Sequence, residues 1–149
     1  MNNEQLSPLI ILVIIAIGFP IFFVAIWSLV CWLIALVGGW QRLAQRYRSN
    51  TVPPPGSKKF DHTYGTFGVA SYRGTLNVAI APDAVYLSVM RIFQVGHPPL
   101  RIPWSDVRVV GDTFFLWIKG VELALGEPGL RSPITTLRLP HDLREALPK

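Results

Sequence analysis

Residues 8–37 read PLIILVIIAIGFPIFFVAIWSLVCWLIALV, an apolar run without a single charged residue. The nearest charges are Glu4 before it and Arg42 after it. About 20 apolar residues in a helix cross a hydrocarbon core of roughly 30 Å, so this run is long enough to span a membrane once but not twice. We therefore predict a transmembrane helix over residues 8–37, preceded by a short extracytoplasmic N-terminus over residues 1–7.

The residues that flank this run argue against a cleaved signal peptide. The preceding MNNEQLSP contains no Lys or Arg, and the run is far longer than a signal-peptide core. Gly18 and Pro20 predict a kink in the helix, because proline removes a backbone donor and clashes with the preceding turn. The aromatic side chains either face lipid or dock on another membrane protein. The candidate docking residues here are Phe19, Phe22, Phe23, Trp27 and Trp32.

Basic residues follow the apolar run and do not precede it. Five Lys and Arg lie between Arg42 and Lys59 with no acidic residue among them. The positive-inside rule then places the N-terminus outside and the C-terminal part in the cytoplasm. From Phe60 onward nine basic residues face eight acidic ones, which argues against a nucleic-acid-binding surface. The single cysteine, Cys31, excludes an intramolecular disulfide.

Residues 38–48 read GGWQRLAQRYR and have the pattern of a short amphipathic helix. Trp40, Leu43, Ala44 and Tyr47 recur at helical spacing on one face, with arginines opposite. We predict an interfacial helix over residues 38–50, its rings at headgroup depth and each arginine contributing about 1 kcal/mol with anionic lipid. Alternatively, the arginines only set the topology. The predicted membrane-interface residues are Trp40, Arg42, Leu43, Arg46, Tyr47 and Arg48.

The remainder of the chain predicts a proline-rich linker and a small β domain. TVPPPGS at residues 51–57 disfavours regular structure, so residues 51–59 are expected to be a semi-rigid spacer. From residue 60 to residue 149, period-two alternation and frequent turns indicate a mostly-β fold of about seven antiparallel strands with a short C-terminal helix. The expected strands are residues 66–72, 76–81, 85–93, 100–110 (irregular), 113–118, 121–125 and 134–139, and the helix is residues 141–147.

A family resemblance supports this fold class. LNVAIAPDAVYLSVMRIFQVGHPPLRIPWSDV, residues 76–107, resembles bacterial pleckstrin-homology-like (PH-like) and GRAM-like domains, in which a YLS strand precedes a loop and an IPW strand. With GGWQRLAQRYR and the prolines, the chain is similar to a group of uncharacterised bacterial single-pass membrane proteins. The closing helix of that fold is shorter here, which leaves one end of the barrel open or covered by a partner. The first hairpin offers only Arg73, whereas family members that bind inositol lipids use several basic residues there.

No motif in the sequence indicates that the protein catalyses a chemical reaction. His62, His97 and His141 lie far apart and lack the spacing of a metal site built on one element. Ser105 and Asp106 do not occur in a Gly-x-Ser-x-Gly elbow, and no glycine-rich phosphate loop is present. We therefore predict no catalytic residue, cofactor or metal ion, and no small-molecule substrate or nucleic acid as a partner.

One further segment suggests an interaction surface. Residues 91–104, RIFQVGHPPLRIPW, are apolar and contain three prolines, so they are expected to protrude between two strands. Such a loop could dock on a partner, dip into the membrane interface or fold back as a lid of the barrel. The candidate docking residues in it are Phe93, Val95, His97, Leu100 and Trp104.

Together these features predict a non-catalytic, membrane-anchored accessory or scaffolding subunit of a larger membrane protein complex, an energy-transducing complex being one such assembly. Its partners would be membrane lipids and integral membrane proteins, with the β domain capping the cytoplasmic face. The alternative is a tethered PH-like domain that binds anionic lipid headgroups or a cytoplasmic protein.

Overall fold

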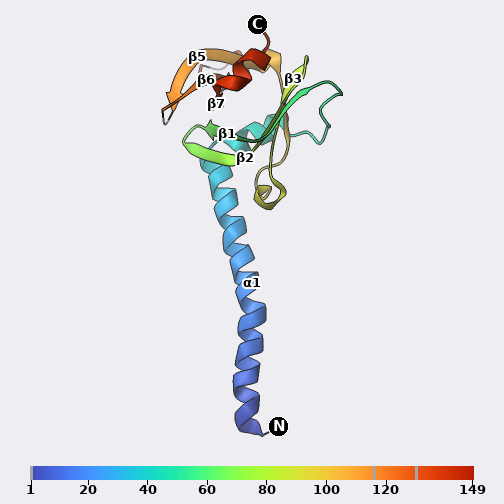
Figure 1. Ribbon diagram of the computed structural model, residues 1–149, viewed down its shortest axis with the longest axis vertical. Coiled ribbons are helices and arrows are strands. Elements are labelled where there is room, and N and C mark those ends of the chain that lie inside the picture. Colours follow the sequence, from blue (N-terminus) through green and yellow to red (C-terminus); the bar gives the residue numbers. More distant parts are fainter. Residues whose placement is uncertain (1, 116, 130) are drawn as a thin grey trace. The chain divides into compact units, whose positions relative to one another are not determined.

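The computed structural model describes residues 2–115, 117–129 and 131–149. The chain divides into two compact units, Met1–Val30 and Cys31–Lys149. The first is the larger part of one long helix, and the second holds a curled, seven-stranded antiparallel sheet with short helices (Figure 1). The predicted fold class is therefore confirmed: one long apolar N-terminal helix, about seven antiparallel strands and a short C-terminal helix.

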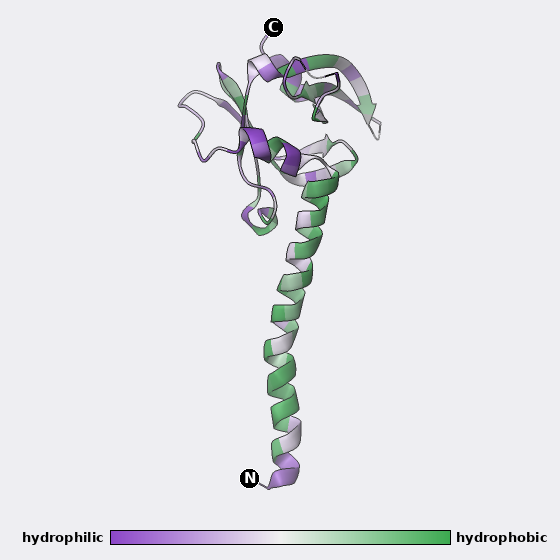
Figure 2. Ribbon diagram, turned by 180° about the vertical axis from the view of Figure 1, so that it is seen from behind, coloured by the Kyte–Doolittle hydropathy of each residue, from purple (hydrophilic) through white to green (hydrophobic). Residues whose placement is uncertain are grey.

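The long helix α1 (Asn3–Val37) is apolar on every face (Figure 2). Its residues 3–27 are all exposed, and the helical assignment continues through Pro8 and Pro20. A helix without a polar face needs apolar surroundings on all sides. Among the described residues, α1 is the one helix that is long and apolar enough to cross a membrane.

A two-glycine joint connects α1 to the next helix, α2 (Trp40–Tyr47). Gly39 has a φ of 84°, in the left-handed region that favours glycine. A Cβ on Gly38 would lie 2.8 Å from the Cβ of Ala70, so only glycine lets the turn between β1 (Lys58–Phe67) and β2 (Ala70–Ile80) approach this closely. The Thr135 hydroxyl donates to the Gly38 carbonyl at 3.0 Å. The chain therefore turns sharply and enters the sheet domain at residue 38.

The sheet is a single curled layer with the strand order β4-β3-β2-β1-β7-β6-β5. Two meanders, β1 to β4 and β5 to β7, are joined where Thr66 and Phe67 of β1 pair with Arg138 and Leu137 of β7. Register shifts in β1–β2 and in β5–β6 bend the strands, as β-bulges do. The strands are β1 (Lys58–Phe67), β2 (Ala70–Ile80), β3 (Ala84–Val89), β4 (Leu100–Pro103), β5 (Val107–Phe115), β6 (Ile118–Leu125) and β7 (Thr135–Pro140).

The concave side of the sheet holds one hydrophobic core. Alternate residues of the strands fill it, and the C-terminal element adds Leu143 and Leu147. That element is a 3-10 helix, η3 (His141–Ala146), which pads the core near β6. Period-two alternation in the sequence predicts a set of inward-pointing strand residues, and all of them are buried: Leu76, Val78, Ile80, Val121, Leu123, Leu125, Leu137 and Leu139.

Two predicted boundaries are wrong because the domain begins earlier than expected. Helix α2 packs inside the core, so the proline-rich segment is a loop within the domain and does not separate it from α1. Lys58 and Lys59 already belong to β1. The expected strands over residues 66–72 and 113–118 each cross a turn between two strands. Short apolar runs carry no marker that distinguishes a strand from a hairpin turn within them.

Candidate functional site

The residues predicted to lie at the membrane interface divide into two groups. Trp40 and Leu43 are 0% exposed and Tyr47 is buried, so they cannot place their side chains among lipid headgroups and that prediction is wrong. Arg42, Arg46 and Arg48, on the opposite side of the helix, are exposed. The prediction of an amphipathic helix was correct, but the apolar face of this helix packs against the sheet domain.

Trp40 is the centre of an aromatic cluster that ties α2 to the sheet. Its ring centroid lies 4.8 Å from that of Phe67, 5.9 Å from that of Tyr72 and 5.2 Å from that of His97. Its indole Nε1 donates to the Pro98 carbonyl at 2.9 Å, which satisfies the buried donor. The cluster therefore joins segments that lie more than 50 residues apart.

A second contact holds the end of α2. The Tyr47 hydroxyl donates to Oδ2 of Asp106 at 2.6 Å. Burial, aided by this hydrogen bond to a carboxylate, raises the pKa of Tyr47 to about 12. Asp106 belongs to the short 3-10 helix η2 (Trp104–Asp106) between β4 and β5, so α2 is tied to the segment that links the two edge strands.

The docking residues predicted in the loop before β4 are mostly inside the domain. His97 and Leu100 are buried, so their prediction as docking residues is wrong. Phe93 is half-buried against the core. Trp104 is half-buried, and its Nε1 donates to the Ala81 carbonyl at 2.8 Å. Only Val95 of this set is exposed.

The docking residues predicted on α1 are all exposed. Phe19, Phe23 and Trp27 stack along one side of the helix, with centroid separations of 6.4 and 6.2 Å. Phe22 and Trp32 are exposed as well. Their exposure leaves them accessible to a partner, and docking on another membrane protein stays a prediction.

A large opening in the described part of the domain lies between β1 and β7. These two strands pair at Thr66 and Phe67 and then diverge, so the hydrogen-bonded ladder between β1 and β7 does not run along their whole length. The resulting cavity has a volume of about 860 Å³. Its walls are the β1–β2 hairpin, the β5–β6 hairpin, the end of β7 and η3. We call this cavity the mouth.

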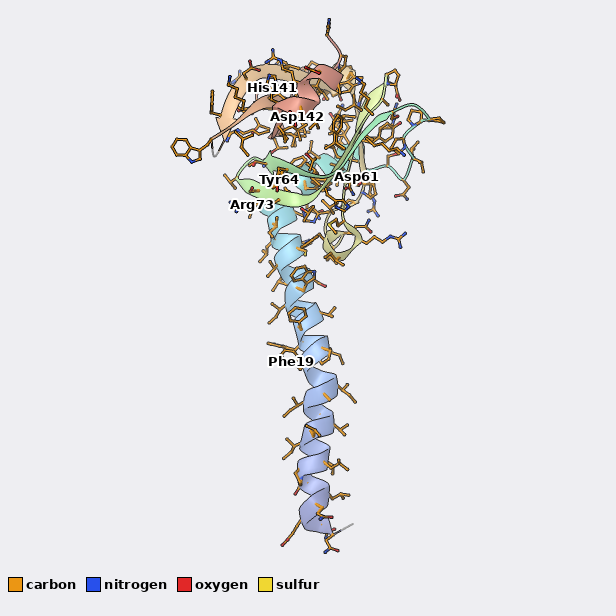
Figure 3. The ribbon with its side chains drawn as sticks, in the orientation of Figure 1. Phe19, Asp61, Tyr64, Arg73, His141 and Asp142 are labelled. Atoms are coloured by element: carbon orange, nitrogen blue, oxygen red, sulfur yellow. The ribbon has the colours of Figure 1, made fainter. Side chains whose placement is uncertain are left out.

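The mouth combines an apolar lining with a charged rim. Figure 3 shows Tyr64 and Arg73 on the β1–β2 hairpin and Asp142 on η3, and all three line the cavity. The apolar walls are formed by Phe60, Ile118, Leu139 and Leu143. Concave apolar sites with a few polar groups at the edge suit ligands or chain segments with an apolar face.

An exposed apolar hairpin tip, formed by Phe114, Trp117 and Ile118, adjoins the mouth. Trp117 is 97% exposed and has a φ of 72°, a conformation rare for a bulky residue. Ile118 both belongs to this hairpin tip and lines the mouth, so the two features form one continuous surface. Sequence reasoning assigned residues 113–118 to a strand and missed this surface. The sequence signal for this surface was Trp117, which lies two residues before Lys119. The sequence predicted no buried partner for this tryptophan.

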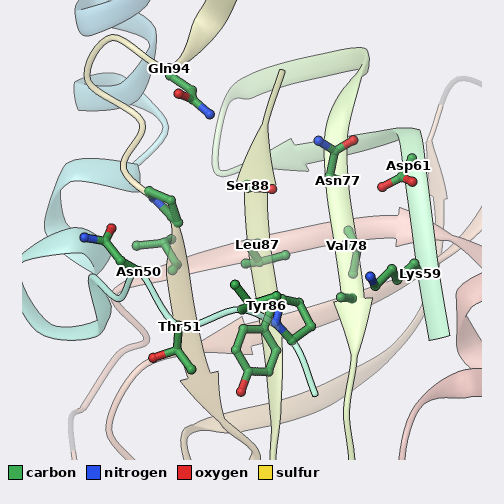
Figure 4. Close-up of a pocket in the computed structure, with 15 residues that line it drawn as sticks. Asn50, Thr51, Lys59, Asp61, Asn77, Val78, Tyr86, Leu87, Ser88 and Gln94 are labelled. Atoms are coloured by element: carbon green, nitrogen blue, oxygen red, sulfur yellow. The ribbon is translucent and has the colours of Figure 1, made fainter. Parts of the chain in front are cut away.

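A second cavity, of about 390 Å³, lies beside β2 and β3 (Figure 4). Asn77, Ser88 and Gln94 contribute polar groups to it, together with Lys59 and Asp61. Among the described residues, no group of three or more His, Cys, Asp and Glu side chains could hold a metal ion. This cavity is smaller than the mouth and its lining is relatively more polar, so the mouth is the stronger candidate site.

The comparisons with known proteins add no family. No family model, no curated protein and no solved structure matches this chain. The resemblance to PH-like domains therefore remains a prediction, and function has to be argued from the site itself.

Proposed function

We propose that the protein is a non-catalytic, membrane-anchored accessory subunit whose sheet domain binds an apolar segment of a partner membrane protein in the mouth. The observation that carries this proposal is the continuity of the apolar mouth with the exposed Trp117 hairpin tip. Tryptophan is enriched among the residues that dominate binding energy at protein interfaces.

Membrane anchoring is supported by the length and composition of α1. We propose that α1 spans a bacterial inner membrane with the sheet domain on the cytoplasmic side. The basic residues after α1 support this orientation, since none precede it. A protease-accessible tag at Lys149 should be cleaved in inverted vesicles and protected in intact cells.

A non-catalytic role is supported by the exposure of most charged groups at the mouth; Arg138, which also lines it, is half-buried and paired with Glu122. Asp61, Arg73, Lys119 and Asp142 all face solvent. Catalytic acids and bases usually sit in desolvated clefts beside a charge partner that adjusts their protonation. The rim charges are better suited to orienting a partner segment at the edge of an apolar site.

The proposal is tested by photocrosslinking in native membranes. A photoreactive amino acid at position 117 should form an adduct with a partner membrane protein, whereas the same amino acid at the exposed control position Val52 should not. Filling the mouth by Ser71→Trp should remove the adduct, because Ser71 lines the cavity. The matched variant Ser71→Ala should retain it.

Two results would contradict this proposal. One is an adduct at position 117 that survives Ser71→Trp, which would place the contact outside the mouth. The other is a monomeric protein in mild detergent at native abundance with no adduct at position 117.

A second candidate function is binding of anionic lipid by three exposed arginines, Arg42 and Arg46 on α2 and Arg48 directly after it. Arg46 is partly engaged, because its guanidinium lies 3.0 Å from Oε1 of Glu127. Replacing all three arginines by glutamine in the full-length protein should remove any preference for phosphatidylglycerol over phosphatidylcholine in reconstituted vesicles. An unchanged lipid preference would discard this candidate.

A further inference from the structure

We propose that the loop between β3 and β4 lies in the headgroup region of the bilayer, where its exposed aliphatic residues contact lipid. We call this segment, residues 90–99, the η1 loop, after its short 3-10 helix η1 (Arg91–Phe93). The inference concerns a surface distinct from the mouth, and it rests on the membrane anchoring proposed above.

The η1 loop is packed directly against the last turns of α1. Gly96 touches the helix so closely that a Cβ on it would lie 3.0 Å from the Cα of Trp32. Gln41 of α2 donates from Nε2 to the Gly96 carbonyl. Trp32, Gln41 and Gly96 all belong to the same compact unit, Cys31–Lys149, so this contact is internal to the domain.

The depth of this contact follows from the length of α1. Its 35 residues extend about 52 Å at 1.5 Å per residue, whereas the hydrocarbon core is about 30 Å thick. A centred helix leaves about seven residues at each end among the headgroups. Trp32 falls in the last of these stretches, at the level where tryptophan is enriched in membrane proteins. Gly96, in contact with it, lies at the same level.

The side chains that the η1 loop exposes suit this environment. Ile92 is 60% exposed and Val95 is 43% exposed. Arg91 beside them is also exposed. Aliphatic side chains at the acyl boundary with a guanidinium among the phosphates are typical of interfacial segments.

The size of the exposed patch favours lipid over a protein as its occupant. A stable protein interface uses about 20–30 residues on each side. The η1 loop presents only Ile92 and Val95 as exposed large apolar residues, and Phe93 is turned toward the core. Lipid contact requires no complementary surface, so two aliphatic side chains are sufficient to add to the binding already provided by α1.

The η1 loop is also held in a fixed conformation. The Trp40 indole donates to the Pro98 carbonyl at 2.9 Å, and His97 Nδ1 lies 3.1 Å from the Val95 carbonyl. The backbone N–H of Met90 donates to the Thr75 carbonyl at 3.0 Å. A fixed loop loses little conformational entropy when it meets the bilayer.

The test uses site-specific fluorescence in the full-length protein. Cys31 is the only cysteine, so Cys31→Ala gives a background in which Ile92→Cys, Val95→Cys and the control Val110→Cys are labelled singly. Val110 lies on β5 and is 56% exposed, close to the value for Ile92. Each labelled protein is reconstituted in phosphatidylcholine–phosphatidylglycerol vesicles and quenched with aqueous iodide or with brominated acyl chains.

Labels at positions 92 and 95 should be quenched by iodide at least about threefold less than the label at position 110, and only these two should be quenched by brominated lipid. Equal iodide quenching at all three positions would overturn the inference. Shielding from iodide without quenching by brominated lipid would also overturn it, since a second copy of the chain would then cover the loop. Circular dichroism checks that each variant is folded, and two independent positions guard against one misfolded variant.

The outcome also separates this inference from the anchoring on which it rests. A protein that fails to float with the vesicles refutes both. A protein that floats while positions 92 and 95 remain as accessible as position 110 refutes the loop contact alone.

Discussion

The helices α1 and α2 follow each other in the chain and use apolar residues in opposite ways. α1 has 35 residues, is apolar all round and is exposed over residues 3–27. α2 has eight residues, and its single apolar stripe is buried in the sheet domain. The contrast shows that an amphipathic pattern identifies which face of a helix is buried. It does not identify whether that face packs against protein or against lipid.

The amino acids of the stripe suit either surface. Tryptophan and tyrosine occur both at bilayer interfaces and in domain cores, because each has a large apolar body and one polar atom. What decides the outcome is the set of distant partners for those polar atoms. The Pro98 carbonyl accepts from Trp40, and the Asp106 carboxylate accepts from Tyr47.

The largest effect should come from placing a carboxylate on each helix. Leu43→Asp puts an unpaired charge into the core and should destabilise the sheet domain by more than about 4 kcal/mol, abolishing its cooperative thermal transition. Ile21→Asp, in the middle of α1, should leave that transition intact but reduce carbonate-resistant membrane integration, at a cost of about 3 kcal/mol. A folded sheet domain in Leu43→Asp would show that α2 is not part of the core.

Truncating one aromatic side chain on each helix tests the same difference between α1 and α2. Trp40→Ala should lower the free energy of unfolding by about 3–5 kcal/mol, because the indole fills the centre of the aromatic cluster. Phe22→Ala, in the exposed part of α1, is the matched control and should leave domain stability unchanged. Chemical denaturation in detergent, followed by near-ultraviolet circular dichroism, measures both. Equal losses in the two variants would contradict the division between core helix and membrane helix.

A smaller effect is expected where α2 meets η2. Tyr47→Phe removes the hydrogen bond to Asp106 and should cost about 1.5 kcal/mol, since the acceptor is charged. A double-mutant cycle with Asp106→Asn isolates the pair. Additive losses, with no coupling between the two substitutions, would show that the contact does not stabilise α2 on the domain.

The smallest effect depends on pH. Burial removes the imidazole from water and lowers the pKa of His97 below its ordinary value of 6.5, while the hydrogen bond to the Val95 carbonyl partly opposes this shift. The folded pKa lies below the unfolded one, so this stabilisation is complete above pH 6.5 and is lost as the pH falls through 6.5 toward the folded value. The slope cannot exceed about 1.4 kcal/mol per pH unit for one proton.

Urea unfolding at neutral and mildly acidic pH measures this slope. His97→Gln should remove most of the loss of stability on acidification, whereas His141→Gln, at the start of the exposed η3 surface, should not. The same acid sensitivity in His97→Gln and the wild-type protein would assign the effect to other groups.

The sequence predicted the features that depend on local patterns. One long apolar helix that ends at Val37, a sheet of about seven antiparallel strands and inward residues such as Leu123 and Leu137 follow from composition and alternation. Proline, aspartate and glycine predict turns at residues 82–83 and 127–129, and the structure confirms both. The turns that the sequence predicts at residues 73–74, 111–112 and 119–120 are wrong, because these residues lie inside β2, β5 and β6.

The features that depend on distant contacts were missed. Nothing near Trp40 indicates that residues 97–98 will pack on it, and nothing near Thr66 indicates that β1 will pair with β7 only briefly. The mouth exists because of that short pairing. Its residues come from four separate stretches of sequence, so their convergence has no local signal.

The two-glycine joint at residues 38 and 39 has a consequence for how the protein meets other molecules. The last turns of α1 already belong to the compact unit of the sheet domain, so an α1 that spans the membrane as proposed would leave the domain no flexible tether above the bilayer. Encounters would then be limited to molecules that diffuse laterally in the same membrane or reach down to its surface. Under this proposal the search for a target is two-dimensional, and binding rates should scale with the surface density of the target and not with its bulk concentration.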